Sequence, residues 1–342
     1  MIFGETLRNR LSVLKALTTG LPLALLSSAA FAQDTATPAA AASSAPAAVA
    51  SGAATYVPMG PDMIKGQPHP GAMWFQTQYS PIGHQALWMN DYVLTPVIIG
   101  IVLIVLVLLI YVMLRFNKRA NPVPSKTSHN TLLEVLWTGI PVLILVIIAV
   151  PSLNLLAHQY KSPPKDAVTV KATGYQWYWG YTYPDNGGFE VISNMLPEEK
   201  AKAEGFPSHL EADKRMVVPV GVPIRLQTTG ADVIHAFAVP SLWFKLDAVP
   251  GKINERLLQI DQPGIYYGQC SELCGARHGY MPIEVEAVPM DVFKAWVRMQ
   301  PGGTIPGEAP AAAPAAAAAP AAAASAAPVA AASAAPAAAP AA

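Results

Sequence analysis

The chain has 342 residues and a formal charge of zero, with 22 basic and 22 acidic side chains. This balance gives no reason to expect a nucleic acid as a partner. Only 13% of the residues are charged, about half the share in an ordinary soluble domain, and the mean hydropathy is +0.33. The composition therefore predicts a protein associated with a membrane.

Residues 1–32 are typical of a secretory signal peptide. Three basic residues precede an apolar run over 16–30, and small residues at 30 and 32 offer a cleavage site. A retained membrane helix is the alternative, and the shortness of the run argues against it. Both interpretations place the following segment on the outer side of the membrane.

Two stretches lack the composition of folded protein. Residues 33 to about 51 are almost entirely Ala, Ser, Pro and Thr, and residues 300–342 repeat clusters of Ala and Pro. Such segments bury too little apolar surface to offset chain entropy, so they predict disordered chain. We therefore expect residues 33–70 to form a linker and N-terminal segment, and 300–342 to form a disordered tail.

Two uninterrupted apolar runs, 92–114 and 135–157, predict membrane-spanning helices. Neither contains Asp, Glu, Lys or Arg, and each exceeds the roughly 20 residues that a helix needs to cross a bilayer. Buried helices of a soluble protein are the alternative, and two uncharged runs of this length argue against it. Residues 71–160 are therefore predicted to form a transmembrane hairpin in a lipid bilayer.

The loop between the two runs predicts the orientation of the hairpin. Residues 115–130 contain four basic side chains and no acidic one, which places this loop in the cytoplasm. The segment before the first run and the region after the second run then lie on the outer side of the membrane. The expected location is a bacterial inner membrane, with the C-terminal domain in the periplasm.

Glu134 stands at the cytoplasmic end of the second run. A carboxylate at a helix end can simply remain hydrated at the membrane interface. It can also receive protons from the cytoplasm. The residues around it leave both interpretations open.

The region 161–299 is predicted to be rich in β-strands. Apolar and polar residues alternate over 167–173, 223–228 and 282–288, and turn signals separate the strands. Short strands at close spacing, without helices between them, are typical of an antiparallel sandwich or barrel. One amphipathic helix is expected over 290–299.

Both cysteines of the chain lie in one pattern, C-x3-C-x3-H-x2-M, formed by Cys270, Cys274, His278 and Met281. Thiolate, imidazole and thioether groups are preferred by soft metals, copper in particular. His235, near the end of a predicted strand, is the candidate for a further ligand. The pattern predicts a copper site in loops at one end of the β-rich region.

A disulfide and a zinc site are the two alternatives for these cysteines. An oxidising compartment and an even cysteine count favour a Cys270–Cys274 disulfide. A disulfide, however, requires neither His278 nor Met281 at a fixed offset. Methionine is a poor zinc ligand, which argues against zinc.

These motifs resemble those of subunit II of haem-copper cytochrome c oxidases of the bacterial and mitochondrial aa3 type, over about 71–299. Residues 266–275 (YYGQCSELCG) are similar to the CuA loop of that family, and further similar segments are 174–179 (GYQWYW), 232–235 (DVIH) and 247–251 (DAVPG). The resemblance implies a membrane-anchored all-β protein, with a two-helix transmembrane hairpin followed by a periplasmic cupredoxin-like Greek-key β-sandwich over 161–299.

The resemblance also implies a binuclear copper centre, CuA. Its implied ligands are the bridging Cys270 and Cys274, then His235 and Met281 on one copper, and His278 and the backbone carbonyl of Glu272 on the other. Two shared thiolates spread one electron over both ions, so little rearranges on electron transfer. The Glu272 side chain is implied as a ligand of a magnesium or manganese ion shared with subunit I.

The activity that the resemblance implies is that of a cytochrome c oxidase complex, in which this chain is the electron-input subunit. It would take electrons from cytochrome c and pass them to haem in subunit I. There dioxygen is reduced to water and protons are pumped. The haems are expected in subunit I alone, and other oxidase subunits are expected partners.

Three residues outside the copper ligands receive implied roles. Trp177 would take the electron from cytochrome c, Asp232 would belong to the acidic docking surface, and Glu134 would mark the entrance of a proton-uptake path. The family often has a second acid before this aspartate, where this chain has Ala231. Other acids that could steer a basic donor are Asp185, Glu190, Glu198 and Glu199.

Three other classes of protein share part of this pattern. Quinol oxidase subunits II have the hairpin and sandwich but lack the copper ligands, which are intact here. A copper carrier would need neither the two-helix anchor nor Trp177. Nitrous oxide reductase has a similar copper loop on a soluble enzyme, which the predicted membrane spans contradict.

Overall fold

The computed structural model describes residues 55–308. The predicted signal peptide over 1–32, residues 33–54 of the linker and residues 309–342 of the tail lie outside the described residues. The prediction of disorder was wrong for residues 300–308, because Ile305 is buried and the Thr304 amide donates to the Asn186 carbonyl at 2.9 Å.

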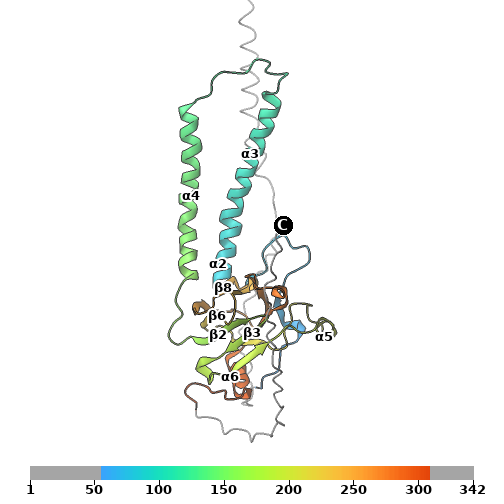
Figure 1. Ribbon diagram of the computed structural model, residues 1–342. Coiled ribbons are helices and arrows are strands. Elements are labelled where there is room, and N and C mark those ends of the chain that lie inside the picture. Colours follow the sequence, from blue (N-terminus) through green and yellow to red (C-terminus); the bar gives the residue numbers. More distant parts are fainter. Residues whose placement is uncertain (1–54, 309–342) are drawn as a thin grey trace, which may run out of the picture. The chain divides into compact units, whose positions relative to one another are not determined.

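Two long apolar helices are suited to cross a membrane (Figure 1). The first helical segment consists of α2 (Pro81–Met89), one π-helical turn η2 (Asn90–Leu94) and α3 (Thr95–Arg115). The second is α4 (Thr131–Gln159). Their most apolar windows have mean hydropathies of 3.5 and 2.5 and are 0% buried within the described chain. These helices are therefore not core helices of a soluble domain, and lipid suits their exposed side chains.

Both helices extend beyond the apolar runs that predicted them, because caps determine where they begin. Ser80 accepts a hydrogen bond from the Gly83 amide at 3.0 Å, so the first helical segment begins at Pro81 rather than at residue 92. Asn130 likewise caps α4 by accepting from the Leu133 amide at 3.2 Å. Glu134 consequently lies in the first turn of α4.

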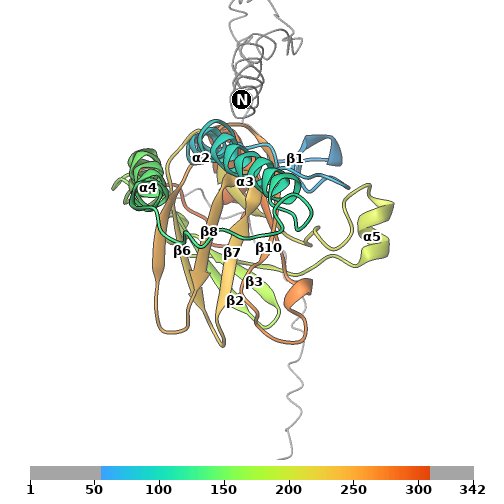
Figure 2. The same cartoon turned by 90° about the horizontal axis from the view of Figure 1, so that it is seen from above.

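The C-terminal part is a sandwich of two sheets. The strand order of the first sheet is β5 (Met216–Pro219), β11 (Pro282–Val288), β10 (Gly264–Cys270), β7 (His235–Val239) and β8 (Phe244–Ala248), with β1 (Ile64–Gly66) also pairing with β10. The order of the second is β4 (Glu190–Ser193), β3 (Tyr178–Thr182), β2 (Val168–Tyr175), β6 (Ile224–Gly230) and β9 (Asn254–Leu258). Figure 2 shows β7, β8 and β10 in one layer and β2 and β3 in the other.

The prediction of an antiparallel sandwich was wrong in part, because both sheets are mixed. Three pairs of strands run parallel: β2 with β6, β5 with β11, and β1 with β10. An alternating pattern shows which side chains face inward, but it carries no information about the direction of the neighbouring strand.

The helices of the sandwich were predicted with mixed success. A short helix, α5 (Glu198–Ala203), lies between β4 and β5, where the sequence pattern predicted none. The closing helix α6 (Met290–Met299) has the predicted bounds and buries Phe293, Trp296 and Val297.

Aromatic side chains fill the space between the sheets and extend the core to the predicted metal loop. Phe237 on β7 is fully buried, with its ring 5.6 Å from that of Trp179 and 6.4 Å from that of Tyr181. Cys270, Cys274 and Met281 belong to the same buried cluster. The predicted metal ligands are therefore rooted in the core of the sandwich.

Replacing Phe237 by alanine should destabilise the sandwich by about 3–5 kcal/mol, because a fully buried ring is lost and a cavity remains. Denaturant unfolding of the purified full-length protein in detergent measures this change. Ile253→Ala is the control, since Ile253 is 59% exposed. Equal stability of the two variants would contradict the assignment of Phe237 to the core.

Candidate metal centre

A loop between two paired strands carries most of the predicted ligands. Cys270 ends β10 and Pro282 begins β11, and the pairing of these strands places Gln269 opposite Pro282. The loop leaves and re-enters the sheet at neighbouring positions, so Cys270 and Met281 are held close together. A short 3₁₀ helix, η5 (His278–Tyr280), shapes its second half.

His235 reaches this loop from the neighbouring strand. It begins β7, which pairs with β10 so that Phe237 lies opposite Cys270. The Ser271 amide continues this pairing by donating to the Ala236 carbonyl at 3.0 Å. As a result, His235 Nδ1 lies 3.9 Å from Cys270 Sγ.

The structure brings all six predicted copper ligands together around the two sulfur atoms. Cys270 Sγ lies 3.9 Å from Cys274 Sγ and 3.3 Å from the carbonyl oxygen of Glu272. Cys274 Sγ lies 3.5 Å from His278 Nδ1 and 3.5 Å from Met281 Sδ. The Glu272 side chain, predicted to bind a different ion, is exposed.

This donor set fits copper better than the alternatives. A disulfide requires about 2.05 Å between sulfurs, and the two cysteines are free in the structure. Two thiols and four further donors exceed the four ligands of a structural zinc site, and thioether and carbonyl groups are unusual zinc ligands. Thiolate, imidazole and thioether together favour copper, and the number of donors suits two ions.

The surroundings shift the pKa values of the two thiols in opposite directions. Burial alone would raise the pKa of Cys270, but hydrogen bonds with His235 and with backbone groups of residues 272 and 236 lower the pKa overall. Burial and the neighbouring Cys270 charge raise the pKa of Cys274. One thiol therefore ionises readily, whereas the second loses its proton when a metal binds.

Asp232 has a position that the sequence analysis did not anticipate. It was predicted as a docking residue, yet its Oδ1 lies 2.9 Å from His235 Nε2 and its Oδ2 accepts from the Gln176 amide at 2.7 Å. A carboxylate on one ring nitrogen holds a histidine with its other nitrogen toward a metal. The three-residue spacing of Asp232 and His235 was the available signal. The side chain is 33% exposed, so a partner can still reach it.

Trp177 and Gln176 bind the metal loop through a single acceptor. The Trp177 indole Nε1 donates to the Cys274 carbonyl at 3.3 Å, and Gln176 Nε2 donates to the same oxygen at 2.9 Å. The half-buried indole therefore connects the surface with a cysteine of the centre. Gln176 was not predicted, since a glutamine between aromatic residues has no pattern of its own.

The structure does not bring Glu134 to the copper ligands. This carboxylate lies in the first turn of α4, where its Oε1 is 2.7 Å from His129 Nδ1. Among the acids predicted to steer a donor, Asp185 accepts from the Thr169 amide at 2.8 Å and Glu198 pairs with Lys202 at 2.5 Å. Hydrogen bonds within the domain thus occupy part of this acidic surface.

Gly174→Ala should lower the copper affinity by about 10- to 100-fold, the cost typical of disturbing the support of a metal ligand. A Cβ at this position would lie 2.7 Å from the His235 ring and displace it. Competition against a copper chelator measures the affinity. Gly279→Ala, in the loop itself but with no atom within 4 Å of the added Cβ, should bind copper normally. Equal affinities for both variants would refute the ligand role of His235.

Two domain models of one protein family match this chain. Residues 168–288 match the family model described as cytochrome c oxidase subunit II, periplasmic domain, and residues 68–155 match the transmembrane domain of the same subunit. A solved periplasmic domain of cytochrome oxidase subunit II from Bradyrhizobium japonicum is 51% identical and covers 39% of this chain and 92% of its own, with a TM-score of 0.36.

Curated relatives extend the match over most of the chain. The probable cytochrome c oxidase subunit 2 of Rickettsia bellii is 48% identical over 231 residues, which are 68% of this chain and 85% of that protein. The cytochrome c oxidase subunit 2 of Cereibacter sphaeroides is 41% identical over 258 residues, or 70% and 84% of the two chains. Together with these matches, the two apolar helices and the β-sandwich show that the chain belongs to the cytochrome c oxidase subunit II family.

Proposed function

We propose that this chain is the electron-input subunit of a haem-copper oxidase and holds a binuclear copper centre. The convergence of two imidazoles, a thioether and a backbone carbonyl on the two cysteine thiols carries the proposal. Cys270 and Cys274 would bridge the ions, His235 and Met281 would complete one copper, and His278 and the Glu272 carbonyl the other. The bound pair would supply reversible one-electron transfer.

The residues of the chain keep such a centre rigid and dry. Met281 and His235 are fully buried, and Cys270 and Cys274 are 5% and 3% exposed. Strand pairing holds both ends of the loop, and Asp232 orients the His235 ring. Ligands that cannot move need little reorganisation when the charge of the centre changes, which favours fast electron transfer.

Trp177 would receive the electron from cytochrome c. Its half-buried indole is connected to the bridging Cys274 by one hydrogen bond and a few covalent bonds. Asp232, beside this route, would belong to the surface that attracts a basic donor. One oxygen of the Asp232 carboxylate already binds His235, so the contribution of Asp232 to docking is limited.

The remaining roles concern the assembled complex. Residues 71–160 would anchor the chain in the bacterial inner membrane and 161–299 would form the periplasmic copper domain, after removal of the signal peptide. Electrons would pass to haem in subunit I, where dioxygen is reduced to water with proton pumping. The exposed Glu272 carboxylate would bind the magnesium or manganese ion shared with subunit I. Glu134 would admit protons from the cytoplasm.

Electron paramagnetic resonance of the copper-loaded, full-length protein tests the stoichiometry of the centre. We expect a mixed-valence signal in which one unpaired electron is shared by two equivalent copper ions. Two bridging thiolates would produce this signal, because they couple the ions strongly. A single-copper signal, or a protein with Cys270 and Cys274 joined as a disulfide, would refute the proposed centre.

Trp177→Phe should slow electron uptake from cytochrome c by an order of magnitude or more, because the ring loses its hydrogen bond to the Cys274 carbonyl. The copper spectrum should remain unchanged. Rapid-mixing kinetics of the assembled oxidase measure the uptake. Trp74→Phe, at an exposed tryptophan that does not contact the metal loop, is the control. Normal uptake in the Trp177 variant would remove this residue from the route.

A further inference from the structure

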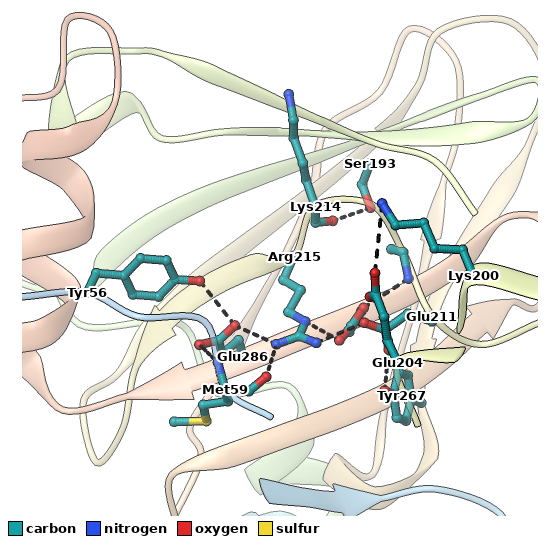
Figure 3. Close-up of polar contacts among 12 residues, drawn as sticks. Tyr56, Met59, Ser193, Lys200, Glu204, Glu211, Lys214, Arg215, Tyr267 and Glu286 are labelled. Carbon is teal, nitrogen blue, oxygen red and sulfur yellow. Dashed lines mark hydrogen bonds and ion pairs between the residues drawn. The ribbon is translucent and has the colours of Figure 1, made fainter. Parts of the chain in front are cut away.

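A second polar site lies at the β5–β11 edge of the first sheet, where one guanidinium is buried among three glutamates (Figure 3). Arg215 immediately precedes β5, Glu211 lies four residues earlier, and Glu284 and Glu286 are on β11. Val285 pairs with Met216 in this part of the sheet, so the arginine and the two β11 glutamates meet. We call these four residues the Arg215 cluster.

The members of the Arg215 cluster are held by direct contacts. Arg215 Nη2 lies 2.8 Å from Glu211 Oε1, Nη1 lies 3.1 Å from Glu286 Oε2, and Nε forms an ion pair with Glu284 Oε1. Both side chains on β11 are 0% exposed, and that of Arg215 is 9% exposed. The Phe206 ring covers the guanidinium, with Cζ 5.0 Å from its centroid. The charges are therefore largely removed from water.

The charges of the Arg215 cluster do not balance. Three ionised carboxylates and one guanidinium leave two uncompensated negative charges. The neighbouring lysines do not correct this, because the Lys200 ammonium lies 3.9 Å from Glu204 and the Lys214 side chain is exposed. An uncompensated buried charge costs several kcal/mol, and uptake of a proton is the usual relief.

The N-terminal segment, residues 56–66, is attached to this cluster. The Tyr56 hydroxyl donates to Glu286 Oε2 at 3.2 Å, and the Met59 amide donates to Glu286 Oε1 at 3.1 Å. The Met59 carbonyl accepts from Arg215 Nη1 at 2.7 Å. Figure 3 shows Tyr56 and Met59 on the Glu286 side of Arg215. The charge state of the cluster is thereby coupled to the docking of this segment.

We propose that the Arg215 cluster is a proton-binding site that holds one proton at neutral pH, and that this proton fastens the N-terminal segment to the β-sandwich. Glu284 is the site of the proton, because it is fully buried and has two donors, the Ala212 amide at 2.9 Å and Arg215, whereas the equally buried Glu286 has three. An open cavity of about 700 Å³, lined by Tyr56, Glu211 and Arg215, gives solvent protons access to the cluster.

The electrostatics agree with this assignment. Burial raises the pKa of Glu284 to about 8, against the lowering effect of Arg215 and with added repulsion from Glu211 and Glu286. The other titratable groups facing Glu284 are tyrosines: Tyr267 on β10, Tyr181 on β3 and Tyr56. Burial raises the pKa of each of them above the usual value, so they stay neutral.

The direction of the pH effect follows from proton linkage. The docked state binds the proton up to about pH 8, whereas an exposed glutamate releases it near 4.5. The docked state therefore holds more protons than the detached state between these values. Its stability relative to the detached state falls as pH rises. The equilibrium constant for detachment of residues 56–66 should therefore increase with pH, by at most tenfold per pH unit for one proton, and become level above about pH 8.

Hydrogen exchange of residues 56–66 in the purified full-length protein tests the coupling, after correction for the intrinsic pH dependence of exchange. In the wild-type protein, exchange of these residues should become faster as pH rises. In Glu284→Gln, which mimics the protonated state, their amides should be protected at all pH values. Glu199→Gln, at an exposed glutamate of α5, should keep the wild-type slope. Protection that is independent of pH in the wild type, or the same slope in Glu284→Gln, would overturn the proposal.

Infrared titration of the wild-type protein tests the proton itself and does not depend on a variant that folds. A carbonyl stretch of a protonated carboxylic acid should disappear near pH 8 and be absent from Glu284→Gln. If the wild-type protein shows no such band, the proposal fails. Neither measurement involves copper or electron transfer, so the result is independent of the proposed oxidase function.

Discussion

The pairing of β10 with β7 on one side and with β11 on the other is the constraint on which the candidate metal centre depends. It places the two ends of the loop over 271–281 side by side and brings His235 from a separate strand to the same end of the sandwich. A loop of this kind would otherwise lose much conformational entropy on binding a metal. Here the strands have already arranged the donors, so the folding of the core prepares the site.

Polar groups around the centre extend this rigidity outward. Asp232 contacts the His235 ring and the Gln176 amide, and the Gln176 side chain binds the Cys274 carbonyl. Trp177 binds the same carbonyl. The residue that would receive the electron and the residues that orient the ligands therefore form one hydrogen-bonded network. Such support is typical of metal sites, where outer residues set the orientation and basicity of the ligands.

The sandwich holds carboxylate charge in two different environments, one partly exposed and one buried. At the metal centre, one carboxylate stands beside a histidine and backbone amides, which compensate its charge and lower the pKa of Asp232. At the Arg215 cluster, one cation stands among three carboxylates and leaves an excess of negative charge. The first arrangement is suited to hold a ligand still, whereas the second responds to the proton concentration.

Part of this protein could be predicted from the sequence alone, because the signals are local. Hydropathy located the two apolar helices, the alternation of residues located several strands, and the spacing of Cys270, Cys274, His278 and Met281 indicated a soft-metal loop. Such patterns depend on one helix, one strand or one loop. The helix bounds at Pro81 and Thr131 were missed, since caps rather than hydropathy determine them.

Features that depend on contacts between distant segments of the chain could be determined only from the tertiary structure. The parallel strand pairs, the contact between Asp232 and His235, and the hydrogen bonds from Gln176 and Trp177 to Cys274 come from the way the folded elements meet. The Arg215 cluster is the clearest case. In the sequence, Glu284 and Glu286 look like ordinary residues of a strand. In the fold they are buried beside Glu211 with an excess of negative charge, which no local pattern encodes.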